Sequence, residues 1–198
     1  MEILFATKKT EKKNYSINGL SKYGFKILSL NELSIDIDVE ETGKTPSENA
    51  IKKAQKYFKA SKIPTVSVDD GLYLEGFPQN KQPGTNVRRI NGKRATDDDM
   101  LKYYTNEISK YGEKINGTWV KSIAIAIDDN KVFNYDFKVK KIFTSTIAKK
   151  RNDGYPLDSI CITPEFNKYS VDLNHDEIKH IQGTRDKKVF EFIYTHLK

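Results

Sequence analysis

The sequence predicts a single α/β domain over residues 1–198, with a mixed, elongated central sheet that is flanked by helices and two lobes with a cleft between them. Two observations favour this class. A period-two segment, a strongly capped helix and a buried strand follow one another between residues 34 and 72, an order typical of α/β folds. The chain is also about one domain long and can bury a core without a linker.

The composition fits a globular protein that does not span a membrane. Hydrophobic residues make up 37% and charged residues 31% of the chain, and no apolar run approaches the roughly 18 residues that a membrane helix needs. The stretch Met1–Ala6 has no basic lead and no cleavage-like site, so it is typical of a first strand rather than a signal peptide. A cytoplasmic location is therefore the default expectation.

The net charge of +7 favours anionic partners without saying which. Nucleotides, nucleic acid and acidic surfaces all qualify, but the lysine pairs are dispersed along the chain, which favours a solvated surface over one binding stripe. The single Cys161 excludes an intramolecular disulfide, and the histidines His175, His180 and His196 are scattered and form no cluster of the zinc type. Any bound metal is expected to have oxygen ligands.

The stretch that organises the chain is residues 66–72, an apolar, β-branched run that ends in Asp69, Asp70 and Gly71. This pattern is typical of a buried strand that brings acids to a cleft, although a strand followed by an Asp-Gly turn fits it too. Adjacent side chains of a strand point to opposite faces, so only one of the two aspartates can point into a given pocket.

The helix before this strand has the clearest local signal. Thr45 is expected to be the N-cap, with Pro46 at the first helical position and Glu48 as the capping-box partner. Apolar residues then recur at helical spacing to give one buried face, and the pair at residues 63–64 ends the element.

The remaining elements are predicted from shorter patterns. A weak helix is expected around residues 15–23, and residues 76–91 are predicted to form a long functional loop because they carry turn formers and two adjacent arginines. The helix that begins at Thr96 carries aromatic residues, which we interpret as core or dimer contacts. We expect strands at residues 3–6, 25–30, 34–39, 118–127, 132–137, 139–143 and 160–162, helices at residues 96–108 and 187–197, and a hairpin turn at residues 128–131.

Several blocks, taken together, resemble the inosine triphosphate pyrophosphatase family over nearly the whole chain. The basic segment 6–12 is similar to the family's first loop, and it is also a plausible phosphate site because it leads from a strand towards a helix. Residues 41–50 are similar to the family's segment of Glu, Gly and Glu-Asn-Ala, and Asp69 aligns with the second acid of the family's acidic strand. Matches continue with a Pro-Gly turn at residues 83–84, an aromatic-acid segment at residues 154–159 and a closing segment from Lys179. The departures from the family pattern are Lys9, Val68, Asp70 and Thr184.

The resemblance implies a hydrolase of noncanonical purine nucleoside triphosphates (ITP, dITP and XTP), which releases the monophosphate and pyrophosphate. It implies Mg²⁺ on Glu41 and Asp69, with Asp69 also activating the attacking water. The implied phosphate-binding residues are Thr7, Lys9, Lys12, Lys53, Lys179 and Arg185, and the implied base-binding residues are Tyr155, Asp158 and Arg89. A homodimer is expected as well.

Two alternatives remain at this point. The similarly folded septum-formation inhibitor family acts on modified pyrimidine nucleotides, but its members open with a Ser-x-Ser-Pro-Arg-Arg-like loop that this chain lacks. A protein that has lost catalysis, or acts on a different nucleotide, and keeps a nucleotide or nucleic-acid surface is the other alternative, and the persistence of Glu41, Asp69 and Lys53 disfavours it. The preferred base does not follow from the sequence.

Overall fold

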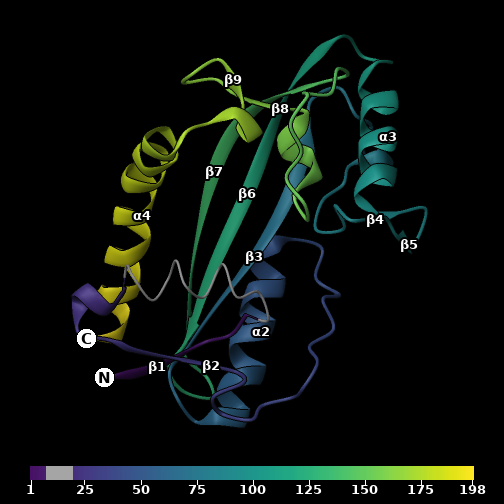
Figure 1. Ribbon diagram of the computed structural model, residues 1–198. Coiled ribbons are helices and arrows are strands. Elements are labelled where there is room, and N and C mark those ends of the chain that lie inside the picture. Colours follow the sequence, from purple (N-terminus) through teal and green to yellow (C-terminus); the bar gives the residue numbers. More distant parts are fainter. Residues whose placement is uncertain (8–19) are drawn as a thin grey trace. The chain divides into compact units, whose positions relative to one another are not determined.

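The structure is a computed structural model that describes residues 1–7 and 20–198, and within them all side chains except those of residues 184 and 185 (Figure 1). The loop residues Lys9 and Lys12 and most of the helix expected around residues 15–23 lie outside the described residues. The last residues of that expected helix, Ser21–Tyr23, form a short 3-10 turn, η1.

Among the residues that the structure describes, the main sheet has seven strands in the order β2-β1-β3-β6-β7-β8-β9, and β4 and β5 form a separate pair. The strands are β1 Glu2–Phe5, β2 Lys26–Ser29, β3 Thr65–Leu74, β4 Arg89–Ile90, β5 Lys93–Arg94, β6 Lys114–Ala126, β7 Val132–Thr144, β8 Cys161–Thr163 and β9 Lys168–Tyr169. β1 pairs in parallel with β2 and β3, whereas β8 pairs antiparallel with β7 and β9. The prediction of a mixed α/β sheet is therefore confirmed.

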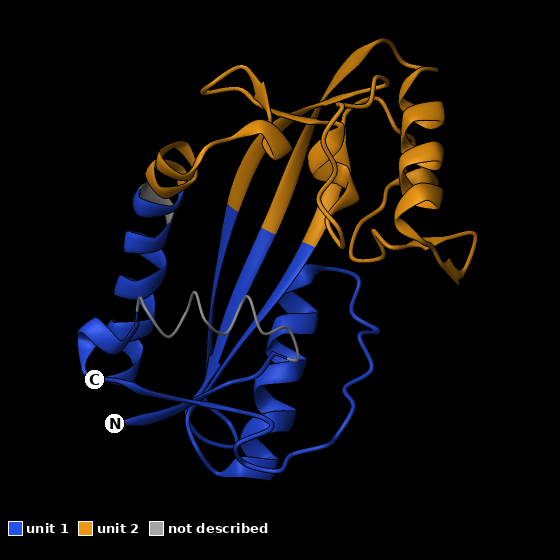
Figure 2. Cartoon of the chain, viewed as in Figure 1, with its two compact units in different colours: residues 1–70, 121–137, 182–198 blue, residues 71–120, 138–181 orange. Residues whose placement is uncertain are grey.

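The chain divides into two compact units (Figure 2). Unit 1 comprises residues 1–70, 121–137 and 182–198, and unit 2 comprises residues 71–120 and 138–181. The strands β3, β6 and β7 contribute residues to both units. That these units are the two lobes of one domain stays a prediction.

In unit 1, helices cover both faces of the sheet. On one face, Ala54 and Phe58 of α2, Pro46–Ser61, pack against Ala124 and Ala126 of β6. On the other face, Ile193 and Leu197 of α4, His175–Leu197, pack with Ile3, Val66 and Ile123. Neighbouring residues of β6 therefore belong to different cores, as the alternation of side chains along a strand requires.

The N-cap Thr45 and the start of α2 at Pro46 are confirmed, but Glu48 does not complete the predicted capping box. The Thr45 hydroxyl accepts a hydrogen bond from the Glu48 N–H at 3.2 Å, which satisfies one of the free donors at the helix start. The Glu48 carboxylate accepts from the N–H of Lys44, at 2.8 Å, and not from that of Thr45. At the other end Lys62 takes a left-handed conformation with φ 56° and donates its N–H to the Phe58 carbonyl.

In unit 2, one helix covers the apolar residues of β3 and β7. Thr96 and Asp99 form the capping box that begins α3, Asp97–Ile108. Tyr104 and Ile108 of this helix are buried in one core with Leu72 and Phe143. The expectation that the aromatics of this helix lie partly in the core is confirmed for Tyr104.

The prediction of a strand at residues 34–39 is wrong. These residues form no strand, although Ile35, Ile37 and Val39 pack against Tyr57 while the aspartates between them are exposed. The period-two pattern reports this one-sided burial, but the backbone carbonyls accept hydrogen bonds from helix side chains, as the Ile37 carbonyl does from Tyr57 at 3.2 Å.

The predicted start of the last helix at residue 187 is wrong, because the helix begins at His175. Asn174 caps it, because its side chain accepts from the Glu177 N–H at 2.9 Å and the Glu177 carboxylate accepts from the Asn174 N–H at 2.9 Å. The first turns carry few apolar residues, so the amphipathic pattern marks only the second half of the helix. None of the helices in residues 1–7 and 20–198 combines the length and the apolar composition that a membrane span requires.

Candidate active site

The candidate site lies in unit 1, around the carboxylate of Asp69 on β3. Asp69 is only 9% exposed, and its carboxylate faces the helix α2. The residue two positions earlier, Ser67, is fully buried and donates its hydroxyl to the Ala50 carbonyl of α2. Alternate residues of β3 therefore turn polar groups towards the first turns of this helix.

Two side chains of α2 donate to Asp69. The Lys53 ammonium lies 2.7 Å from Oδ1, and the Asn49 Nδ2 lies 3.2 Å from Oδ2. Asn49 and Lys53 are four residues apart, so the helix places both on one face, one turn from each other. Each oxygen of Asp69 thus accepts a hydrogen bond from α2.

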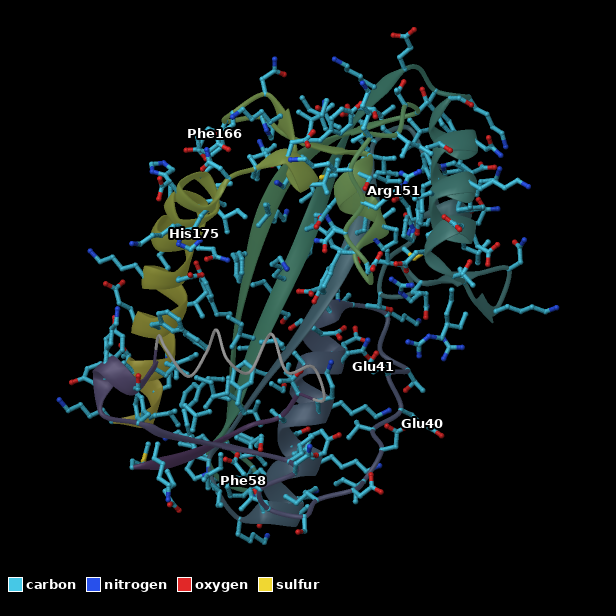
Figure 3. The ribbon with its side chains drawn as sticks, in the orientation of Figure 1. Glu40, Glu41, Phe58, Arg151, Phe166 and His175 are labelled. Carbon is cyan, nitrogen blue, oxygen red and sulfur yellow. The ribbon has the colours of Figure 1, made fainter. Side chains whose placement is uncertain are left out.

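The irregular segment before α2 carries Glu41, which is labelled in Figure 3. Its carboxylate pairs with the same lysine. Glu41 Oε1 lies 3.0 Å from the Lys53 ammonium, and the Glu41 side chain is 52% exposed. Two residues later, the Gly43 N–H donates to Asn49 Oδ1 at 2.7 Å. Glu41 and Asp69 therefore share one cation, although they are far apart in the sequence.

Charge and burial act in opposite directions on this cluster. Burial lowers the pKa of Lys53, but the charges and hydrogen bonds of Asp69 and Glu41 outweigh it, so the pKa is raised and the ammonium is favoured. Burial also raises the pKa of Asp69, and the hydrogen bonds from Lys53 and Asn49 oppose this shift only in part. A carboxyl with a raised pKa is a better proton acceptor than an ordinary aspartate, once it is ionised.

Asp70 points away from this cluster. Its carboxylate pairs with Lys121 of β6, at 3.2 Å. Val68, two residues earlier in the strand, packs into the core that α4 covers. The sequence predicted that only one of the two aspartates can face a given pocket, and the structure places Asp69 alone beside Lys53 and Asn49.

Only the first residues of the predicted phosphate-binding loop, Ala6 and Thr7, are described, and they follow β1 where it pairs with β3. In the parallel pairing of β1 and β3, Phe5 lies opposite Val66, and the Ala6 N–H donates to the Val66 carbonyl at 2.8 Å. Thr7 follows directly at this end of β1. Lys179 is exposed on the part of α4 that belongs to unit 2, and the side chain of Arg185 lies outside the described residues.

The predicted base-binding residues lie in unit 2. Tyr155 is 37% exposed and precedes the short helix η3, Pro156–Ser159. Asp158 accepts a hydrogen bond from the Asn152 amide at 2.9 Å. Arg89, which we expected to contact the base, is exposed on β4.

The neighbouring Arg88 has a defined position instead. Its guanidinium donates to Asp97 Oδ1 at 2.6 Å and to the Gly154 carbonyl at 2.9 Å, and the Gly154 N–H donates to Asp97 Oδ2 at 2.7 Å. The hydrogen bonds from Arg88 and Gly154 lower the pKa of Asp97. This closed set of contacts fixes the backbone directly before Tyr155.

Comparison with known proteins identifies the family. The model of the Ham1 family matches residues 3–187. This chain belongs to the Ham1 family. The predicted resemblance is thereby confirmed at the level of the family.

Relatives of this Ham1 chain cover most of its length. The dITP/XTP pyrophosphatase of Staphylococcus epidermidis is 28% identical over 151 residues, which are 76% of this chain and 75% of the relative. That of Staphylococcus aureus strain MRSA252 is 26% identical over 168 residues, 82% of this chain and 80% of the relative. Among solved structures, the HAM1 protein of Coxiella burnetii superposes with a TM-score of 0.79 and 25% identity, covering 100% of this chain and 98% of that one. The Ham1 protein of S. aureus has a TM-score of 0.76 and 22% identity, covering 95% and 100%, and supports the fold.

The carboxylates of Glu41 and Asp69 are candidate ligands for a divalent cation. Glu41 and Asp69 already share the charge of the Lys53 ammonium, so their carboxylates are placed to stabilise positive charge between them. Mg²⁺ is commonly held by one or two carboxylates together with substrate phosphates and water. Within the described residues, no group of three or more His, Cys, Asp or Glu side chains is arranged to hold a metal.

Sequence reasoning missed two parts of these arrangements. Asn49 was noted only as part of a motif, although it is fully buried and donates to Asp69. Asp97 enters the sequence analysis only as part of the helix expected at residues 96–108, although it binds Arg88 and the Gly154 backbone. A polar residue one turn before a site lysine was the available signal for Asn49; no local signal distinguishes Arg88 from Arg89.

Proposed function

We propose that this Ham1 chain hydrolyses noncanonical purine nucleoside triphosphates (ITP, dITP and XTP) to the nucleoside monophosphate and pyrophosphate. Two relatives that cover about three quarters or more of the chain are named dITP/XTP pyrophosphatases. The observation that carries the proposal is the buried Asp69 carboxylate, which accepts from Lys53 and Asn49 while Lys53 also binds Glu41. A carboxylate in such a position can act as the base for the attack of water on a phosphoric anhydride.

In the proposed reaction, Asp69 accepts a proton from the attacking water. The water oxygen forms a bond to the α-phosphorus, the bond from this phosphorus to the αβ-bridging oxygen breaks, and pyrophosphate leaves with that electron pair. Burial raises the pKa of Asp69, which makes the carboxylate a stronger base than an exposed aspartate. Lys53 places a positive charge 2.7 Å from this carboxylate.

The proposed cofactor is Mg²⁺, held by Glu41 and Asp69. When bound, it supplies charge neutralisation to the phosphates. The lysines and the arginine of the predicted phosphate set, Lys9, Lys12, Lys53, Lys179 and Arg185, contribute further positive charge in this proposal. Tyr155 is proposed to stack on the base and Asp158 to accept hydrogen bonds at its edge, while the Arg88–Asp97 pair supports their segment. Arg89 is retained as a further candidate for the base. Homodimerisation and a cytoplasmic location stay predictions.

A screen of pyrophosphate release tests the proposal. The purified protein with Mg²⁺ is offered ITP, dITP, XTP, ATP and GTP, and Asp69→Asn is the matched inactive control. We expect turnover of the deaminated nucleotides that exceeds turnover of ATP and GTP, and a loss of about 100-fold or more in Asp69→Asn. Turnover that prefers ATP or GTP, or that persists in a folded Asp69→Asn protein, would contradict the proposal.

A further inference from the structure

The side chain of Asn49 connects two segments of the candidate site. It lies on α2 with 0% of its surface exposed, and both ends of its amide are used. Oδ1 accepts from the Gly43 N–H at 2.7 Å, and Nδ2 donates to Asp69 Oδ2 at 3.2 Å. A fully buried residue does not touch a nucleotide, so any effect it has on the reaction passes through Gly43 and Asp69.

The chemistry of the two partners fixes which way the amide points. A backbone N–H only donates, so the atom that faces Gly43 must be the carbonyl oxygen Oδ1. The NH₂ group then faces Asp69, where an ionised carboxylate only accepts. One amide thus connects the segment that carries Glu41 to the strand that carries Asp69, with a donor and an acceptor each in its proper place.

The close approach at Gly43 depends on glycine. A Cβ atom at this position would lie 2.6 Å from Asn49 Oδ1 and 2.8 Å from the Glu48 Cβ, both well inside the distances that real Cβ atoms adopt. Gly43 lies only two residues from Glu41, so its backbone position limits where the Glu41 side chain can start. The hydrogen bond between Gly43 and Asn49 therefore requires both the amide of Asn49 and a residue without a side chain at position 43.

We propose that Asn49 is a positioning residue, which fixes the Gly43 backbone and the Asp69 carboxylate relative to each other and so presents Glu41 and Asp69 together to a divalent cation. This rests on the proposed role of the two carboxylates as cation ligands. Lys53 also contacts both carboxylates, but its ammonium is a point charge on a flexible stem and does not fix their orientation. A short, buried amide with two directional hydrogen bonds does.

The binding of Mn²⁺ without nucleotide tests this role independently of catalysis. Asn49→Ala removes both hydrogen bonds, and the matched control is Asn116→Ala, which removes an exposed amide that donates to Glu75 at 2.7 Å. We expect the Kd of Mn²⁺, measured by electron paramagnetic resonance, to rise about 10-fold or more in Asn49→Ala, the usual effect of losing a partner of a metal ligand. It should be unchanged in Asn116→Ala. At saturating Mg²⁺, kcat should fall while the KM for ITP stays near its wild-type value.

A measurement on the wild type covers the case in which Asn49→Ala does not fold. On addition of Mg²⁺, the side-chain NMR signals of the Asn49 NH₂ group should shift together with the Asp69 carboxyl signal, while those of Asn116 should not. Equal Mn²⁺ affinity of Asn49→Ala and the wild type, or an Asn49 signal that does not respond, would overturn the positioning role alone. A wild type that binds no Mn²⁺ would overturn the proposed cation ligands as well.

Discussion

Replacing Lys53 by methionine tests how strongly this lysine supports the buried carboxylate. The substitution keeps most of the stem and removes only the ammonium, which lies 2.7 Å from Asp69 and 3.0 Å from Glu41. The side chains of Lys53 and Asp69 are 13% and 11% exposed, so their contact is a buried pair, whereas Glu41 is 52% exposed and screened by water. The loss should therefore come mainly from Asp69.

Removing one partner of a buried pair typically costs about 3–5 kcal/mol, because the other charge stays buried without compensation. For a chain of this size, each kcal/mol lowers the Tm by roughly 2–4 °C, so we expect a Tm lower by about 6–20 °C at neutral pH. Thermal unfolding followed by circular dichroism measures this directly. Lys26→Met, which breaks the exposed pair of Lys26 and Glu2, is the matched control and should leave the Tm nearly unchanged.

The loss of Tm in Lys53→Met should depend on pH. Burial already raises the pKa of Asp69, and Lys53 is the main group that lowers it, so Lys53→Met should raise that pKa further. An acid whose pKa is higher in the folded than in the unfolded state loses stability as the pH rises from the unfolded pKa through the folded pKa. The loss of Tm caused by Lys53→Met should thus be larger at pH 8 than at pH 5. In the double variant Lys53→Met/Asp69→Asn, most of this loss should disappear. A deficit that does not depend on pH, or no deficit, would refute the argument.

Three further predictions concern activity and assembly. Asp69→Asn should lower kcat about 100-fold or more, while Asp70→Asn, on the opposite face of β3, should matter less; equal losses would contradict the assignment. Asp158→Ala should reduce the ratio of kcat/KM for ITP over ATP by an amount worth ~1–3 kcal/mol, and Lys12→Ala should weaken both nucleotides alike, whereas an unchanged ratio in Asp158→Ala would place base recognition elsewhere. Light scattering at micromolar concentration should give the mass of a homodimer, through the aromatic-rich helix α3, and a monomeric mass would refute this.

Local signals predicted the central part of unit 1 well. The sequence Thr45-Pro46-Ser47-Glu48 carries its own capping hydrogen bond, so the start of α2 needs no information from the rest of the fold. The alternation along β3 is equally local, and it correctly separated Asp69 from Asp70. Such features depend on residues that are close in the sequence, so they can be predicted without knowledge of the rest of the fold.

Other features depend on partners that are distant in the sequence. The pattern at residues 34–39 predicts one-sided burial, which is present, but the presence of a strand depends on a neighbouring backbone, and here Tyr57 of α2 takes that place. The choice between Arg88 and Arg89 is of the same kind, because it is decided by Asp97 and by the Gly154 backbone of a later segment. Periodicity and composition carry no information about either partner.

The departures of this chain from the family pattern on β3 can be understood from the same alternation. In the resemblance to the family's acidic strand, Val68 stands where that strand has its first acid and Asp70 where it has a serine, and both side chains point away from α2. Val68 packs into the core that α4 covers, and Asp70 pairs with Lys121, so each replacement is accommodated on that other face. The contacts of Asp69 with Lys53 and Asn49 involve neither residue. A strand can therefore change two of three consecutive residues and keep the one carboxylate, with both of its hydrogen-bond donors, on which the proposed chemistry depends.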